Sequence, residues 1–139
     1  MVDSLTPDER SERMSRIRGK DTAPELALRR ALHGLGLRYR LHGASLPGRP
    51  DLVLRRYEAV VFVHGCFWHR HSGCKVANMP KSNTVFWKAK FERNVQRDAE
   101  VRRALKRLGW RVFVVWECEL SSTEKSEKVG RRLAARIRR

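Results

Sequence analysis

The sequence predicts an α/β protein with a mixed central sheet flanked by helices. Short runs rich in β-branched and aromatic residues alternate with stretches of helical spacing, capping signals open the helices, and glycines close them. With 139 residues, 41% of them hydrophobic, the chain has the size of one domain with its own core. We expect a helical arm over residues 1–20 and a single domain over residues 21–139.

Two helices are expected first. A capping box that begins at Thr6 predicts a short helix to about Arg18, whose few apolar residues indicate a loosely attached arm. A second capping box begins at Thr22 and predicts a helix to about His33, which Gly34 should end.

Strands are expected in the middle of the chain. Alternating apolar residues over 37–41 predict one strand, and β-rich runs over 51–54 and 58–64 predict a hairpin at the centre of the sheet. The run from Trp110 to Trp116 is continuous and apolar, which is typical of a strand buried on both faces.

Two further helices flank this last strand. Residues 84–108 predict a long helix that Gly109 should end, and an amphipathic helix should run from about Ser122 to the arginine-rich end. The expected order is therefore ααβββαβα. Within the long helix, six large apolar residues fall near helical spacing: Phe86, Phe91, Val95, Val101, Leu105 and Leu108.

The charge of the chain points to a polyanionic partner. Thirty-one Lys and Arg residues against 15 Asp and Glu give a net charge of +16, which favours nucleic acid over an anionic membrane surface. The apolar stretches are too short to span a membrane and the amino terminus lacks a signal sequence, so we expect a soluble cytoplasmic protein. Charge alone does not separate an enzyme from a passive binder.

Three cysteines lie where they could bind a metal. Cys66 and Cys74 flank a loop that carries histidines, and Cys118 follows the last expected strand. Together with His71 they form the four-ligand set of a structural zinc site, with His69 as a competing fourth ligand. Such a site is a brace, because four protein ligands leave no open position for a reacting water. Three ordinary buried thiols are the alternative.

A second site is indicated by an aspartate before the central hairpin. Asp51 opens one strand and His64 ends the next, which is the outline of a restriction-endonuclease-like active site that holds Mg²⁺ against the scissile phosphate. The usual second strand of that superfamily carries Glu, any residue, then Lys, and here Phe62 and His64 occupy those positions. The alternative for Asp51 is a turn carboxylate after Pro50.

Longer segments carry a more specific likeness. The chain resembles the very-short-patch repair (Vsr) endonucleases, bacterial enzymes that nick DNA at T:G mismatches, over almost its whole length. The matching segments are Ser45-Leu-Pro-Gly-Arg-Pro-Asp51, Phe62-Val-His-Gly-Cys-Phe-Trp-His69, Phe86-Trp87, Asn94-Val95 with Asp98, Leu108-Gly-Trp-Arg-Val112 and Val115-Trp-Glu-Cys118.

The resemblance implies a role for each matching residue of the metal site. Asp51 would bind the catalytic Mg²⁺ with help from the backbone carbonyl of Val63, which lessens the need for a Glu at Phe62. His64 would contact the water shell of the metal.

The resemblance also implies a general base. His69 would lie near the scissile phosphate, oriented by Asp98, and Asn94 lies one helical turn before Asp98, so both can point at one site. Because His69 then has a role of its own, we favour His71 as the zinc ligand. The alternative for Asp98 is an ion pair with a neighbouring arginine.

Glu25 matches an active-site position of the family, although its place in the second capping box already explains it. His33 and His42 match nothing in the family, and we interpret both as surface histidines.

Mismatch recognition is expected from apolar wedges. In the family, Phe67 and Trp68 would enter the base stack beside the mismatch, and Met14 and Ile17 would enter from the other groove. Unstacking costs least where pairing is already poor, which favours a T:G wobble. Arg49 and the basic helix 88–107 are candidate phosphate contacts.

The expected function is therefore a Mg²⁺-dependent, zinc-braced endonuclease that nicks double-stranded DNA 5′ to the mispaired thymine left by deamination of 5-methylcytosine. The alternatives are a restriction-type nuclease of the same fold with another DNA substrate and a non-catalytic zinc-containing DNA-binding module. The resemblance implies a monomer on the bacterial nucleoid, with a mismatch-repair coordinating protein and a repair polymerase as partners.

Overall fold

The computed structural model describes residues 22–139. The expected first helix and the arm over residues 1–20, with Met14 and Ile17, lie outside the described residues. No helix between residues 22 and 139 is long and apolar enough to cross a membrane. The elements, in chain order, are α2 (Ala23–Gly34), β1 (Arg40–Leu41), β2 (Leu52–Leu54), the 3₁₀ turn η1 (Arg55–Tyr57), β3 (Ala59–His64), α3 (Thr84–Arg107), β4 (Arg111–Trp116), the 3₁₀ turn η2 (Glu117–Leu120) and α4 (Thr123–Ile137).

The four strands form one mixed sheet in the order β1-β2-β3-β4. β1, β2 and β3 pair antiparallel, whereas β4 lies parallel to β3 after a crossover through α3. Val61 of β3 is opposite Leu52 on one side and Phe113 on the other. The predicted mixed sheet and the predicted central hairpin are both confirmed.

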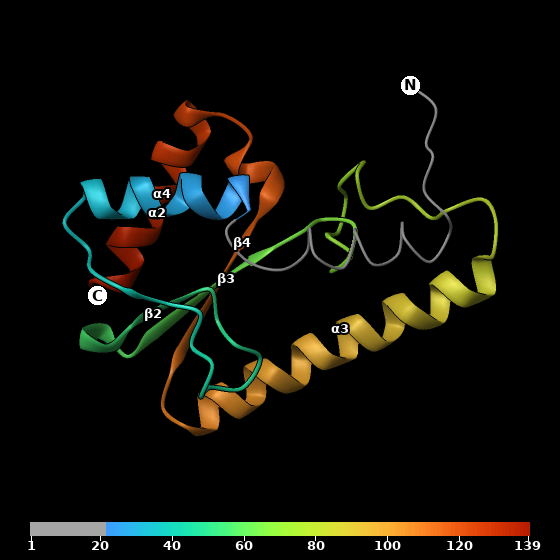
Figure 1. Ribbon diagram of the computed structural model, residues 1–139, viewed down its shortest axis with the longest axis horizontal. Helices are drawn as coiled ribbons and strands as arrows, with labels where there is room; N and C mark the ends of the chain where they lie inside the picture. Colours follow the sequence, from blue (N-terminus) through green and yellow to red (C-terminus); the bar gives the residue numbers. More distant parts are fainter. Residues whose placement is uncertain (1–21) are drawn as a thin grey trace.

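Helices cover both faces of the sheet (Figure 1). Successive side chains of a strand point to opposite faces, so β2 sends Leu52 and Leu54 toward α2 and α4 and sends Val53 toward α3. The larger core, on the side of α2 and α4, includes Leu28, Leu32, Val61, Val115, Leu133 and Ile137. The smaller core, under α3, includes Val60, Phe62, Val101 and Leu105.

The helix pair α2 and α4 is closely packed because small residues meet at the contact. A Cβ atom added at Gly130 of α4 would lie 2.8 Å from the Cβ atom of Ala31 in α2. At the start of α2, Thr22 and Glu25 make both hydrogen bonds of the predicted capping box. The sheet end next to this capping box carries the site.

Three sequence predictions about the elements were wrong in detail. The strand predicted over 37–41 is paired only at Arg40–Leu41, because the N–H of Leu37 bonds instead to the carbonyl of Leu32 at the end of α2. β4 buries only Phe113 and Val115, since it is the edge strand of the described sheet and is covered on one side by the small core alone.

The long helix also departs from the prediction. Of its six large apolar residues only Phe91 and Leu105 are buried, whereas Phe86, Val95 and Leu108 are exposed. Figure 1 gives the reason, because the first half of α3 extends beyond the sheet toward the loop that follows β3. That half packs on the loop through ring contacts such as Phe67 with Phe91.

Candidate active site

Three groups of polar side chains gather around the end of β3 and the loop after it. In each group the ligand atoms all lie within 4.8 Å of one another. The groups are Glu25, His42 and Asp51, here called the carboxylate cluster; His64, His69 and Asp98, the histidine cluster; and Cys66, His71, Cys74 and Cys118, the cysteine cluster. Val63 and His64, neighbours on β3, connect the first two groups.

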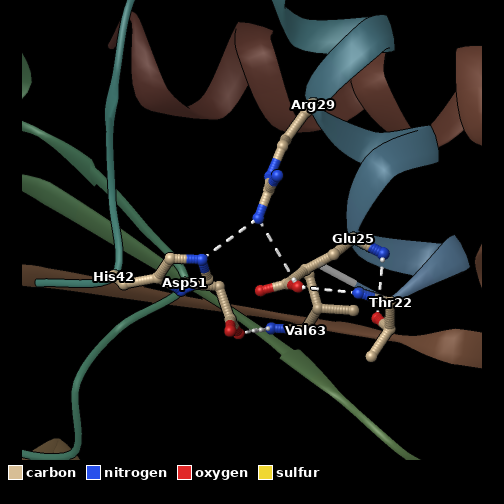
Figure 2. Close-up of polar contacts among 6 residues, drawn as sticks. All are labelled: Thr22, Glu25, Arg29, His42, Asp51 and Val63. Carbon is tan, nitrogen blue, oxygen red and sulfur yellow. Dashed lines mark hydrogen bonds and ion pairs between the residues drawn. The ribbon is translucent and has the colours of Figure 1, made fainter. Parts of the chain in front are cut away.

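Asp51 is held against the end of β3 by the hairpin register. Because Leu52 pairs with Val61, Asp51 lies near Val63, and the backbone N–H of Val63 donates to Asp51 Oδ2 at 2.6 Å (Figure 2). Burial raises the pKa of the Asp51 carboxyl to about 8, with a further increase from the neighbouring Glu25 carboxyl. Two carboxyl groups that share a buried site retain a proton that a cation can replace.

Glu25 caps a helix and also faces this site. Its Oε2 accepts a hydrogen bond from the backbone N–H of Thr22 at 3.1 Å and lies 3.5 Å from Nη2 of Arg29. Its Oε1 is buried and has no hydrogen-bond partner among the described residues, although the side chain is only 2% exposed. The two interpretations of Glu25 are therefore compatible, since one oxygen serves the cap and the other faces Asp51 (Figure 2).

His42 was wrongly predicted to be a surface histidine. It is half-buried, belongs to the carboxylate cluster, and has its Nε2 atom 3.3 Å from Nη2 of Arg29. Pairing of Leu41 with Leu52 brings His42 next to Asp51, where the backbone N–H of His42 donates to the backbone carbonyl of Asp51 at 3.0 Å. Only this strand register, which composition and spacing do not reveal, could have indicated the contact. His33, the other predicted surface histidine, is exposed as expected.

The histidine cluster has the geometry of an oriented base. His69 Nδ1 lies 2.7 Å from Asp98 Oδ2. Because a carboxylate only accepts hydrogen bonds, Nδ1 carries a proton, and in the neutral form of the ring the lone pair is then on Nε2. The His64 ring stacks on that of His69 with centroids 3.9 Å apart. Burial, followed by the nearby charge of His69, lowers the pKa of His64 to about 3, so this ring stays neutral.

Asn94 positions the loop that carries His69. Its side-chain amide donates to the backbone carbonyl of Trp68 at 3.1 Å, one residue before His69. Asp98 lies one turn later on α3, so a single helix face fixes both the loop backbone and the imidazole. The sequence placed both residues at one site, and the structure brings each of them to the same loop.

Three candidate DNA-contacting residues, Phe67, Trp68 and Arg49, are close in sequence to members of the histidine and carboxylate clusters. Phe67 and Trp68 are half-buried, and the Phe67 ring contacts the rings of Trp87 and Phe91 at centroid distances of 5.8 and 5.1 Å. Arg49 is exposed, with φ of 48°, two residues before Asp51.

The cysteine cluster unites the four residues favoured from the sequence. Parallel pairing of β3 with β4 brings the segments that follow them together, and Cys118 Sγ lies 3.5 Å from Nδ1 of His71. The His71 ring stacks on Trp116 at 4.2 Å. Burial raises the pKa of the Cys66 thiol to about 12, so a bound cation is what would deprotonate it. The competing ligand His69 is instead bonded to Asp98.

The fold and the three clusters define the class of protein. A buried and a half-buried carboxylate beside an oriented histidine, at one end of a mixed sheet in a chain of net charge +16, are the arrangement of an α/β nuclease.

Comparison with known proteins gives the family. Residues 2–75 match the DNA mismatch endonuclease Vsr family. Type II nicking enzyme V.XorIIP of Xanthomonas oryzae pv. oryzae is 50% identical over 121 residues, which is 87% of this chain and 88% of that protein. DNA mismatch endonuclease Vsr of Escherichia coli is 46% identical over 125 residues, 90% of this chain and 80% of that protein. The chain belongs to the Vsr family, and as a member it is a DNA endonuclease.

Proposed function

We propose that the protein nicks double-stranded DNA 5′ to the mispaired thymine of a T:G mismatch, the product of 5-methylcytosine deamination, by Mg²⁺-dependent hydrolysis of one phosphodiester bond. The observation that carries this proposal is the 2.7 Å contact between His69 and Asp98 beside the carboxylate cluster. It supplies a base for water next to a set of oxygen donors for a hard cation.

His69 is the general base in this proposal. Its Nε2 lone pair takes a proton from the attacking water, and Asp98 holds the ring in the required tautomer and stabilises the charged form that results. His64 remains neutral and buried behind this ring. It therefore contributes hydrogen bonding to the water around the cation and adds no second positive charge.

Asp51 and the backbone carbonyl of Val63 hold the catalytic cation in this proposal, with Glu25 contributing through Oε1. The fit is supported by the donor set, which is made of hard oxygens, and by the buried Oε1 that has no hydrogen-bond partner among the described residues. A bound Mg²⁺ supplies positive charge that stabilises the developing charge on the phosphate.

Zn²⁺ is the structural cation in this proposal. Three thiolates and one imidazole match the tetrahedral ligand preference of zinc and leave no open position. The cluster connects the end of β3 to the segment after β4, and the Cys66 N–H bonds Glu117 Oε1 at 3.1 Å beside it. Zinc thus fixes the start of the loop that carries Phe67, Trp68 and His69.

Mismatch recognition rests on Phe67 and Trp68, with Met14 and Ile17 of the arm from the other groove. The Phe67 ring already packs against Trp87 and Phe91, and the Trp68 ring against Trp87, so insertion into a base step costs little ordering of the protein. Arg49 and the basic face of α3 bind phosphates. The protein acts as a cytoplasmic monomer on nucleoid DNA, and the proposal includes a mismatch-repair coordinating protein and a repair polymerase as partners.

A nicking assay tests this function. The full chain with Mg²⁺ is given duplexes that differ only in one T:G, T:A or C:G pair, in several flanking sequences. The proposal predicts one nick 5′ to the mispaired thymine and intact matched duplexes. Equal cutting of T:A and T:G would identify a restriction-type nuclease instead, and binding without any product would identify a non-catalytic module.

The control for this assay is a histidine outside the site. His33→Ala changes an exposed residue of α2 and should nick at the parent rate, whereas His69→Ala should bind the T:G duplex and fail to nick it.

A further inference from the structure

His42 is a half-buried histidine that the proposed mechanism does not use. It lies in the carboxylate cluster, where its ligand nitrogen and the oxygens of Glu25 and Asp51 are all within 4.8 Å of one another. Ligands on opposite sides of an ion with bonds of about 2.1 Å stand about 4.2 Å apart. The three side chains are therefore close to the spacing that one cation requires.

The orientation of the His42 ring supports a ligand role. The Arg29 guanidinium carries only donors, so the contact of its Nη2 with His42 Nε2 at 3.3 Å requires a lone pair on that nitrogen. Metal binding by imidazole uses such a lone pair. Figure 2 shows the ring edge directed toward the same space as the two carboxyl groups.

The backbone holds His42 in this place. Its N–H donates to the carbonyl of Asp51 at 3.0 Å, and the N–H of Gly43 donates to the carbonyl of Pro50 at the same distance. These two bonds continue the β1–β2 ladder, so His42 and Asp51 keep their relative positions.

A second observation points to a ligand at this position. Glu25 is 2% exposed, and its Oε1 has no hydrogen-bond partner among the described residues. A buried carboxylate oxygen without a donor costs free energy unless a cation or a proton satisfies it. This oxygen faces the space between His42 and Asp51 (Figure 2).

We propose that His42 is a direct ligand of the catalytic cation, so that this site has mixed nitrogen and oxygen donors. The inference rests on the proposed function, because it takes the carboxylate cluster as the cation site. Oxygen donors suit both Mg²⁺ and Mn²⁺, whereas an imidazole ligand favours transition metals over Mg²⁺. The site therefore accepts Mn²⁺ and Co²⁺ as working ions, and His42 is the residue that sets this preference.

The Arg29 guanidinium lies beside the proposed cation site. Its Nη2 contacts both His42 Nε2 and Glu25 Oε2, at 3.3 and 3.5 Å, so one guanidinium charge partly neutralises the cluster. When a cation binds His42 through Nε2, it takes the place of this guanidinium contact.

Electron paramagnetic resonance of Mn²⁺ bound to the zinc-loaded full chain tests the inference without measuring catalysis. Electron spin echo modulation reports a ¹⁴N nucleus that is directly coordinated to the ion. We expect this signal in the parent and in the control His33→Ala, and its loss in His42→Ala. The Mn²⁺ dissociation constant of His42→Ala should rise at least about tenfold. Removal of a residue that only hydrogen-bonds to a metal ligand already weakens metal affinity by about this factor. The Mg²⁺ constant should change much less.

The outcomes separate the inference from the proposed function. The role of His42 would be overturned if the nitrogen signal persisted in His42→Ala. It would also be overturned if the parent showed no nitrogen signal although Asp51→Asn abolished Mn²⁺ binding. Either result would leave the cation site in place. Mn²⁺ binding that is unchanged in Asp51→Asn would overturn the cation site itself. Zinc content and the thermal unfolding midpoint of each variant show that it is folded.

Discussion

The cysteine cluster and the carboxylate cluster lie at the same end of the sheet and differ in what they leave open. The cysteine cluster has four side-chain ligands from two segments, which is a complete tetrahedral set. The carboxylate cluster has three side chains, which leaves positions for water and for a phosphate oxygen. In the proposed function, the number and softness of the donors therefore distinguish a structural metal site from a catalytic one.

The two clusters also differ in what they connect. Cys66 and Cys118 follow the ends of two parallel strands, so a metal bound by the cysteine cluster would hold these two ends together. Glu25, His42 and Asp51 come from α2 and from the ends of β1 and β2, which the capping box and the strand ladder already fix. The geometry of the carboxylate cluster thus comes from the fold itself, whereas in the proposed function the loop after β3 is held by the metal of the cysteine cluster.

Asp51→Asn is expected to have the largest effect and to affect catalysis alone. Loss of the buried carboxylate should weaken cation binding and reduce nicking of a T:G duplex about 10⁴-fold, the equivalent of several kcal/mol of charge stabilisation. Single-turnover nicking measures this change. Because the pKa of Asp51 is raised on folding, ionisation of this carboxyl destabilises the folded parent as the pH rises. Asp51→Asn removes this cost, so at pH 8 the free energy of unfolding of the variant should equal or exceed that of the parent. A variant that loses nicking by unfolding would contradict the account.

His69→Ala should come next, with a loss of about 10²–10⁴-fold in nicking, as for removal of a general base. Metal content and DNA affinity should not change. Asp98→Asn should have a smaller effect, because the amide can still hold the ring by a hydrogen bond but cannot stabilise its charged form. Equal losses in Asp98→Asn and His69→Ala, measured under single-turnover conditions, would show that Asp98 does more than orient and stabilise His69.

Cys118→Ala should show the opposite pattern, with a loss of stability. Removal of a ligand should release zinc and lower the free energy of unfolding by more than about 3 kcal/mol, since loss of a structural metal belongs to the largest class of mutational effects. Denaturant unfolding and metal analysis measure the two changes. Ser121→Ala, an exposed change in the same segment, is the control. Full stability with zinc absent would show that the cluster is no brace.

The smallest expected effect is on the pH dependence of cation binding. Because the pKa of Asp51 is raised to about 8, a proton must leave when the cation binds below that pH, and affinity should rise about tenfold per pH unit up to pH 8. Burial is the main cause of the raised pKa and the Glu25 carboxyl is the second. Glu25→Gln removes the second cause, so the increase of cation affinity with pH should level off at a lower pH. Calorimetry of Mn²⁺ binding checks both, with the exposed Glu58→Gln as control. A pH-independent affinity would mean that Asp51 is ionised before the cation arrives.

The sequence predicted what depends on local spacing. The capping box at Thr22 and the hairpin over β2 and β3 rest on patterns within a few residues. The set of three cysteines and a histidine rests on donor chemistry, and the choice of His71 over His69 rests on the role that the family resemblance implies for His69. The contact of His42 with Asp51 could not be predicted, because it depends on how β1 pairs with β2. The exposure of Phe86 and Val95 depends on α3 being longer than the sheet that it covers, which apolar periodicity does not encode.

Treatment of the full chain with EDTA tests the division between the two clusters most directly. Zinc content and nicking of a T:G duplex are measured on the same treated sample, before and after Mg²⁺ is added. We predict that about one zinc ion per chain remains in the closed site, that nicking is lost, and that Mg²⁺ alone restores it. Nicking that continues without added Mg²⁺, or that disappears only as zinc leaves, would contradict the account.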